Sequence, residues 1–122
     1  MLNCIIAGLG GFAGSVLRYL AGKLPLGQTT GFPVNTLLIN VLGSFVIGLI
    51  AALGAKYSGL DSRLVLFLKV GLCGGFTTFS TFSLETFELI RAGACGTAAA
   101  YAVLSAVLGV LAVLLAAALV KA

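Results

Sequence analysis

The residues with the clearest chemical potential lie in one stretch, "GLCGGFTTFSTFSLETFE", from Gly71 to Glu88. A glycine pair is followed there by six hydroxyl residues in ten positions, interleaved with phenylalanines: Thr77, Thr78, Ser80, Thr81, Ser83 and Thr86. Hydroxyl groups can replace the water shell of a small ion without a fixed charge that would trap it. An isolated Ser or Thr more often bonds to a carbonyl of its own helix. The density of hydroxyls nevertheless favours a site for a small anion or another polar solute.

Other polar side chains are spaced so that they share helical faces. Thr36 and Asn40 are four residues apart, and Tyr101 and Ser105 repeat that spacing. Residues four apart lie on one side of a helix. An asparagine amide has four hydrogen-bonding positions, which it cannot all satisfy within its own helix. We therefore expect Asn40 to contact either a neighbouring helix or a ligand, with the ligand favoured.

Two phenylalanines, Phe79 and Phe82, lie three residues apart among the hydroxyls. Aromatic ring edges are weakly positive, so paired rings can face an anion. A cation transporter would need a carboxylate inside the bundle, and the only ones near a hydrophobic segment are Glu85 and Glu88. The chain has no histidine, and its three cysteines lack metal-binding spacing. We expect neither an enzyme nor a Cys/His zinc site.

The glycines Gly74 and Gly75 precede the hydroxyls and favour a helix that is broken near Gly74–Thr78. Such a break frees backbone carbonyls for a hard monovalent cation and N–H groups for an anion. It is tolerated at membrane depth only where it is buried in protein or lines a cavity. A simple packing kink is equally compatible with the glycines.

The elements that must hold these residues are membrane-spanning helices. The chain has 122 residues, of which 61% are hydrophobic and only 8% charged, whereas about a quarter are charged in a soluble domain. About 20 apolar residues are needed to cross a bilayer. Four segments qualify, at about 2–22, 33–55, 63–90 and 97–120. We expect a single all-α domain, 1–122, and interpret the first segment as a retained span and not a signal peptide.

Small residues in the first and third spans predict close helix–helix packing there. Gly10 and Gly14 form one small-xxx-small motif, and Gly71 and Gly75 form another. Lipid supplies no hydrophobic drive for helix association, so helices in membranes rely on such close approach.

Positive charges are balanced between the two sides of the predicted bundle. One side holds Lys56, Arg63 and Lys121, with Lys69 close to it, and the other holds Arg18, Lys23 and Arg91. Orientation follows the Lys/Arg imbalance, and here there is almost none. We expect insertion in both orientations and assembly as an antiparallel, dual-topology homodimer. The dispersed net charge of +4 does not suggest a nucleic-acid partner.

Three segments, "GGFAGSVLRY", "NTLLINVLGSFVIGL" and "GLCGGFTTFSTFSLE", closely resemble the Fluc/CrcB fluoride channels in sequence and order. The resemblance implies a bacterial inner-membrane protein that exports toxic fluoride passively from the cytoplasm. It further implies an antiparallel homodimer with two pores and a single structural sodium ion (Na+) at its centre.

The same resemblance implies roles for particular residues. The implied fluoride pathway comprises Phe79, Phe82, Asn40, Thr36, Ser80, Thr81, Ser83, Tyr101 and Ser105. Arg18 and Glu85 would lie in a vestibule or near a pore end, and the carbonyls of Gly74 and Thr77 would hold sodium. Gly109 departs from family members that carry a further hydroxyl at this position, so the polar track on the fourth helix is left open.

Three other transmembrane functions fit the sequence less well. Small proton-coupled multidrug exporters also have four spans, but they carry a glutamate in the first span, where this chain has no acid. A structural subunit of a larger complex would explain the small residues but not the clustered hydroxyls. A fluoride/proton antiporter is disfavoured because no mid-span His or acid provides a proton relay.

Overall fold

The computed structural model describes residues 1–122, and every regular element in it is helical. In chain order these are α1 (Leu2–Gly22), α2 (Val34–Lys56), α3 (Ser62–Leu66), the π-helical segment η1 (Phe67–Cys73), α4 (Gly74–Phe76), α5 (Phe79–Arg91) and α6 (Cys95–Lys121). Four helical stretches are long and apolar enough to cross a membrane, the third being Ser62–Arg91. The prediction of an all-α chain with four spans is confirmed, and each stretch begins and ends within two residues of its predicted bounds.

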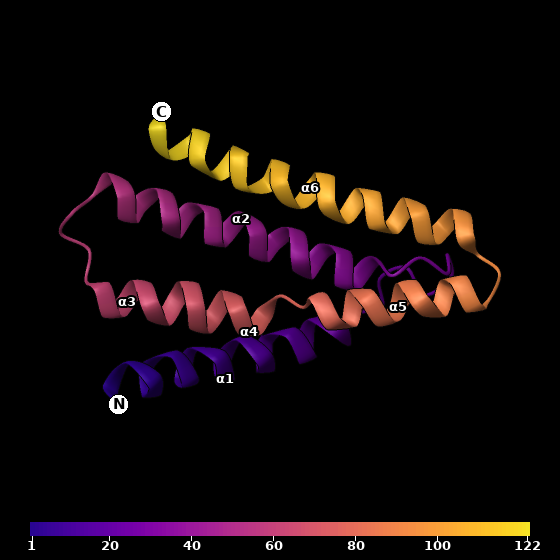
Figure 1. Ribbon diagram of the computed structural model, residues 1–122, viewed down its shortest axis with the longest axis horizontal. Coiled ribbons are helices and arrows are strands. Elements are labelled where there is room, and N and C mark those ends of the chain that lie inside the picture. Colours follow the sequence, from indigo (N-terminus) through magenta and orange to yellow (C-terminus); the bar gives the residue numbers. More distant parts are fainter.

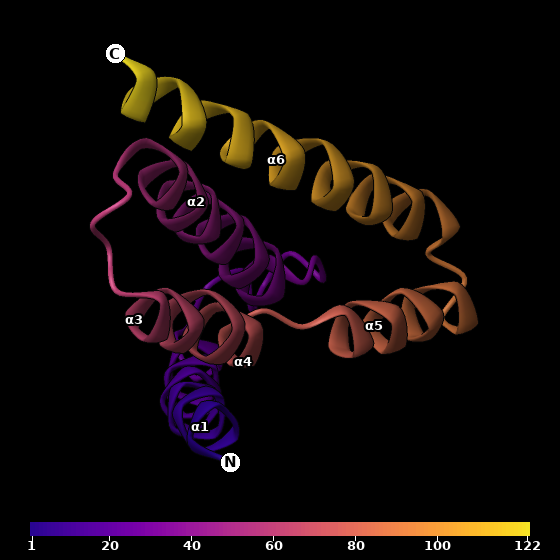
Figure 2. The ribbon, with the colours of Figure 1, turned by 60° about the vertical axis from the view of Figure 1, so that its left-hand side comes forward.

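The helices form two close pairs that are linked through the third stretch. Helix α2 packs along α6, while α1 packs against η1 and α4. Figure 1 shows α2 and α6 running in the same direction, with α3, η1, α4 and α5 following one another across the molecule. Figure 2 shows α1 crossing beneath the α3–α4 end of this stretch. Both termini lie at the same end of the bundle, as an even number of crossings requires.

Glycines bring α1 into backbone contact with the third stretch. A Cβ on Gly71 would lie 2.7 Å from the Cα of Gly10, and one on Gly75 would lie 3.0 Å from the Cα of Gly11. Real Cβ atoms do not approach other atoms so closely, so neither position admits a larger side chain without displacing backbone. The packing role predicted for the glycines of both motifs is confirmed, since Gly14 likewise faces backbone of Leu72 and Gly75.

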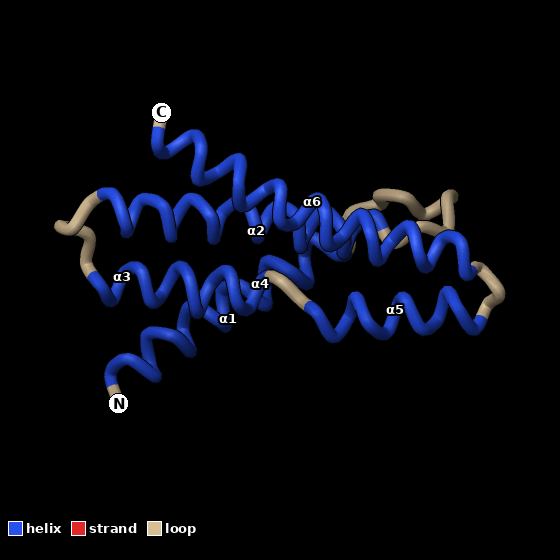
Figure 3. Tube along the Cα trace, turned by 45° about the horizontal axis from the view of Figure 1, so that its top comes forward, coloured by secondary structure: helices blue, strands red, loops and turns tan.

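The regular helix stops for two residues between α4 and α5. Thr77 has φ −80° and ψ 154°, and Thr78 has φ −148° and ψ 115°, so both are extended. Helix α5 then begins at Phe79, with the Thr78 hydroxyl accepting a hydrogen bond from the Thr81 N–H at its N-terminus. Hydroxyl side chains are favoured at this capping position because they satisfy a helical N–H that has no partner. Figure 3 shows the resulting loop between the helical segments.

The outer surface is apolar and the interior small or polar. Leucine, valine and isoleucine side chains are exposed along α1 and α6, where lipid replaces water around the protein. Tyr101 is fully buried, and Thr36 is 7% exposed. Apolar side chains thus cover the outside, and the few buried polar groups lie where they can be paired.

Candidate functional site

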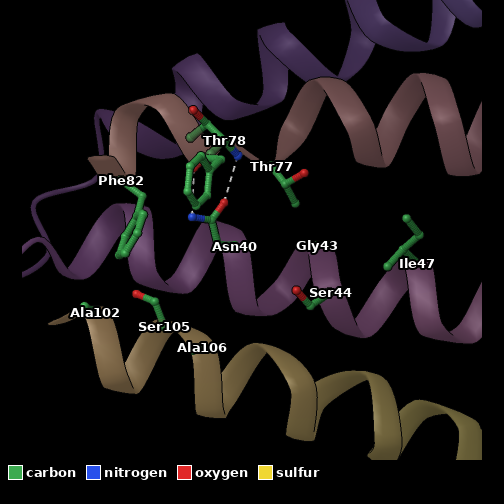
Figure 4. A pocket seen from close by; sticks show the side chains of 11 residues that line it. Asn40, Gly43, Ser44, Ile47, Thr77, Thr78, Phe82, Ala102, Ser105 and Ala106 are labelled. Atoms are coloured by element: carbon green, nitrogen blue, oxygen red, sulfur yellow. Dashed lines mark hydrogen bonds between the residues drawn. The ribbon is translucent and has the colours of Figure 1, made fainter. Parts of the chain in front are cut away.

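Asn40 joins α2 to the interruption in the third stretch. Its Nδ2 donates to the Thr78 carbonyl at 3.1 Å, and its Oδ1 accepts from the Thr78 N–H at 2.8 Å. Figure 4 shows both bonds between the asparagine amide and the extended backbone. The amide thus replaces hydrogen bonds that a continuous helix would have made. One N–H of Nδ2 is left for another partner.

The interruption removes the helical partners of the carbonyls just before it, including those of Gly74 and Thr77. In a continuous helix the N–H of Thr78 would bond to Gly74, but it bonds to Asn40 instead. The N–H of Thr81 would bond to Thr77, but it bonds to the Thr78 hydroxyl at 3.1 Å. The carbonyls of Gly74 and Thr77 accept no hydrogen bond from these groups. They are the two carbonyls for which the resemblance implies sodium.

Arg18 contacts the same interruption from α1. Its Nε donates to the carbonyl of Gly75 at 3.1 Å. The side chain is half-buried and also lines a cavity at this end of the bundle. The guanidinium therefore has one fixed protein partner, and its other N–H groups are left for further partners.

A cavity of about 420 Å³ lies between α2, the interruption and α6. Its lining includes two polar side chains, Asn40 and Ser105, and two aromatic rings, Phe79 and Phe82. The other lining residues are Gly43, Ser44, Ile47, Thr77, Thr78, Ala102 and Ala106. Figure 4 shows the polar groups of α2 and α6 directed into this space. No charged side chain lines the cavity, so any ion there would be held by hydroxyl and amide groups alone.

The two phenylalanines form part of an aromatic row. The rings of Phe79 and Phe82 are 5.6 Å apart between centroids, and those of Phe82 and Tyr101 are 5.1 Å apart. Phe79 is 80% exposed on the single chain, whereas Phe82 is half-buried. The Phe79 ring therefore lies on the outside of the single chain, at the edge of the first cavity.

A second cavity, of about 480 Å³, lies toward the end of α1. Arg18, Thr36, Thr81 and Glu85 line it, and Thr78 lines both cavities. Both cavities therefore border the interruption. Lys23 adds a second positive side chain to this cavity, which makes it a suitable entrance for an anion.

A hydrogen-bonded chain connects three helices beside the second cavity. The Thr36 hydroxyl donates to Glu85 Oε1 at 2.7 Å, and the Tyr101 hydroxyl donates to Glu85 Oε2 at 2.8 Å. The carboxylate of α5 thus lies between α2 and α6. Intramembrane polar groups are stable when paired in this way, and they mark functional sites by default.

Three hydroxyls of the predicted pathway have partners within their own segment. Ser83 donates to the Phe79 carbonyl at 2.9 Å, as is common for serine in a helix. The hydroxyls of Thr81 and Ser80 lie 2.9 and 3.3 Å from that of Thr78. Ser80 and Ser83 are exposed and line neither cavity of the single chain.

Ser105 differs from these three residues, because its hydroxyl is buried without any hydrogen-bond partner. It lines the first cavity from α6, opposite Asn40. Buried polar groups without partners are rare in proteins, and a bound ion or water commonly explains them.

Two contributors were missed in the sequence. Ser44 lines the first cavity and lies four residues after Asn40, so the spacing that singled out Thr36 and Asn40 would have found it. Asn35 donates to the carbonyls of Ala21, Gly22 and Leu24, at 3.2, 3.0 and 2.8 Å. No local sequence pattern indicates this contact, because it depends on the path of the loop between α1 and α2.

Comparison with known proteins places the chain in a family. A family model described as "CrcB-like protein, Camphor Resistance (CrcB)" matches residues 5–117. A protein from Nitrobacter winogradskyi, named "Fluoride-specific ion channel FluC", is 52% identical over 103 residues, covering 83% of this chain and 81% of its own. Proteins of the same name from Ruminiclostridium cellulolyticum and Agrobacterium fabrum are 50% identical over 97 residues (76% and 72% covered) and 42% identical over 114 residues (93% and 91% covered). The chain is thus a multi-pass membrane protein that belongs to the CrcB family.

Proposed function

We propose that this protein is a passive, fluoride-selective ion channel that exports fluoride from the cytoplasm. Fluoride as the permeant ion is supported by the names of the relatives, which match over most of both chains. The observation that carries the channel assignment is the cavity lined by amide, hydroxyl and aromatic groups without a fixed charge. Such a lining binds an anion strongly enough for entry and weakly enough for exit. The family assignment makes the protein a transport protein and not an enzyme.

The proposed pathway begins at the second cavity and continues past the interruption into the first. Arg18 and Lys23 attract fluoride into the vestibule, where Thr36 and Thr81 offer hydroxyls beside Glu85. At each step the ion accepts hydrogen bonds from new donors, which replace the water molecules that it has lost.

In the first cavity, Asn40 and Ser105 donate hydrogen bonds to the ion. The ring edges of Phe79 and Phe82 provide weakly positive contacts. Tyr101 orients Glu85 and supports the ring of Phe82. Ser80 and Ser83 contribute from the exposed face of α5, where a partner chain would complete the lining.

We further propose that two chains assemble as an antiparallel homodimer with two pores. The near-equal Lys/Arg content of the two sides supports insertion in both orientations. The exposure of Phe79 and Gly74 supports an interface there, because neither is covered within one chain.

A structural sodium ion fits the chemistry of the interruption. The carbonyls of Gly74 and Thr77 have lost their helical partners, and a carbonyl without a partner at membrane depth is costly. Carbonyl oxygens are ligands for a hard cation, so Na+ between the two chains would satisfy both groups of each chain. The ion would fix the backbone from which Phe79 and Phe82 project.

The test of the channel assignment is fluoride efflux from liposomes that contain the purified protein, followed with a fluoride electrode. Potassium and valinomycin set the membrane voltage. We expect rapid efflux that stops when no counter-ion can cross, because passive movement of F⁻ alone is electrogenic. Efflux that continues without a counter-ion would instead indicate coupled exchange, and none at all from well-folded protein would exclude a fluoride channel.

A further inference from the structure

Close contacts at two glycines define the register in which helices α2 and α6 pack. A Cβ on Gly48 would lie 3.0 Å from the Cα of Val113, and one on Gly109 would lie 3.6 Å from the Oγ of Ser44. The two members of each pair differ by the same 65 positions. Since the helices run in the same direction, this offset is maintained from turn to turn (Figures 1 and 2).

The same offset aligns the polar residues of the two helices into successive levels. The first level is Thr36 with Tyr101, which are joined through Glu85. The second is Asn40 with Ser105, which line the first cavity together. Each level lies one helical turn beyond the previous one.

A third level follows, and it consists of Ser44 and Gly109. Ser44 lines the same cavity as Asn40, on the same face of α2. Gly109 presents no side chain, and the first atom that a Cβ there would meet is the Ser44 hydroxyl, at ordinary contact distance. One level further, Gly48 meets the backbone of Val113, so the helices close and the polar levels end.

The hydroxyl of Ser44 is free to bind an ion. Of the four hydroxyls that line the first cavity, Thr77 donates to the Cys73 carbonyl at 2.8 Å, and Thr78 lies 2.9 Å from the Thr81 hydroxyl. Ser44 and Ser105 have no such hydrogen bond. Figure 4 shows both serine hydroxyls in the space between α2 and α6, turned away from the axes of their own helices.

We propose that Ser44 is a further ion-contact residue, which donates a hydrogen bond to fluoride one turn beyond Asn40. Gly109 leaves the room that the ion occupies at this level. The hydroxyl that α6 lacks at Gly109 is thus supplied by Ser44 of α2, across the same gap. This inference rests on the proposed fluoride channel, and it extends the pathway by one contact.

The test compares fluoride efflux from liposomes for the native protein, Ser44→Ala, and two double variants. Ser44→Ala removes the hydroxyl and introduces the residue with the highest helix propensity, so the helix is preserved. Ser44→Ala/Gly109→Ser returns a hydroxyl from the opposite helix. Ser44→Ala/Gly109→Ala is its matched control, because it adds the same Cβ without the oxygen. Each protein is first checked for a single species by size-exclusion chromatography.

We expect Ser44→Ala to lower the initial efflux rate about tenfold, the effect of losing one hydrogen bond to a charged group. The Gly109→Ser double variant should recover most of that rate, and the Gly109→Ala double variant should not. Equal rates for the native protein and Ser44→Ala would overturn the inference while leaving the channel intact. Equal rates for the two double variants would overturn it as well. An inactive native protein would instead remove the proposed channel, and this inference with it.

Discussion

The two helix pairs use small residues for opposite purposes. Between α1 and η1, glycines bring two backbones into contact and leave no room between them. Between α2 and α6, the contact is closed at Gly48 but opens toward Gly109 into a cavity lined by Asn40 and Ser105. The closed pair fixes one side of the interruption, and the open pair faces the other. Glycine in a membrane bundle can thus either close an interface or make space in it, and the facing helix decides which.

The largest effect is expected from breaking the closed pair with Gly71→Ala. The new Cβ would lie 2.7 Å from the Cα of Gly10 and 2.8 Å from the carbonyl oxygen of Ala7, so the helices must separate. We expect a loss of about 1–3 kcal/mol or more in stability. Thermal unfolding in detergent measures it, and an unchanged midpoint would show that the two helices are free to move apart.

At the open α2–α6 pair, Asn40→Asp should lower fluoride transport without unfolding the protein. A carboxylate cannot donate to the Thr78 carbonyl, and it adds a negative charge beside the first cavity. We expect fluoride efflux to fall about a hundredfold, because like charges at this depth repel strongly and a donor is lost. Asn3→Asp makes the same chemical change on the exposed start of α1 and should leave efflux unchanged. Full efflux in Asn40→Asp would remove Asn40 from the pathway.

A smaller effect should follow Asn35→Ala, which releases the end of α1 from the start of α2. The Asn35 Nδ2 reaches three carbonyls at the end of α1 and in the following loop. We expect a loss of about 1–2 kcal/mol, as for other side chains that satisfy helix-terminal groups. The unfolding midpoint should fall, while Asn3→Ala, which removes an exposed asparagine of α1, should not lower it.

The smallest effect, a gain in stability, is expected for Gly8→Ala in α1. Nothing lies within 4 Å of a Cβ at this position, only two residues from Gly10. Alanine in a helix is more stable than glycine by about 0.5–1 kcal/mol. A small rise in the unfolding midpoint would confirm that close approach is confined to one face of α1. A large fall would mean that Gly8 also lies in an interface, such as one with a partner chain.

Much of this arrangement follows from local sequence. Long apolar runs predicted the four spans, and the paired small residues predicted close helix approach at both motifs, although not that they would face each other. Both signals depend only on spacing along one helix. The proximity of Thr36 to Tyr101 did not follow, because Glu85 joins them from a third helix.

The register between helices was also inaccessible to sequence reasoning. Four-residue spacing identified Asn40 and Ser105 separately, but only packing shows that they share one level. Arg18 was expected to attract anions, and the structure adds that its Nε is bonded to the Gly75 carbonyl. Contacts of this kind depend on the path of the loops, which composition and periodicity do not determine.

The π-helical segment η1 has a consequence for how the length of the third stretch can vary. A π turn contains about one residue more than an α turn, and such segments occur mostly as single-turn bulges inside α-helices. Loss of one residue between Phe67 and Cys73 could therefore be absorbed by conversion to an ordinary α-helix. The flanking segments would keep their facing directions. Natural deletions in this family should accordingly be tolerated within η1 more readily than within α5, where no surplus residue is available to lose.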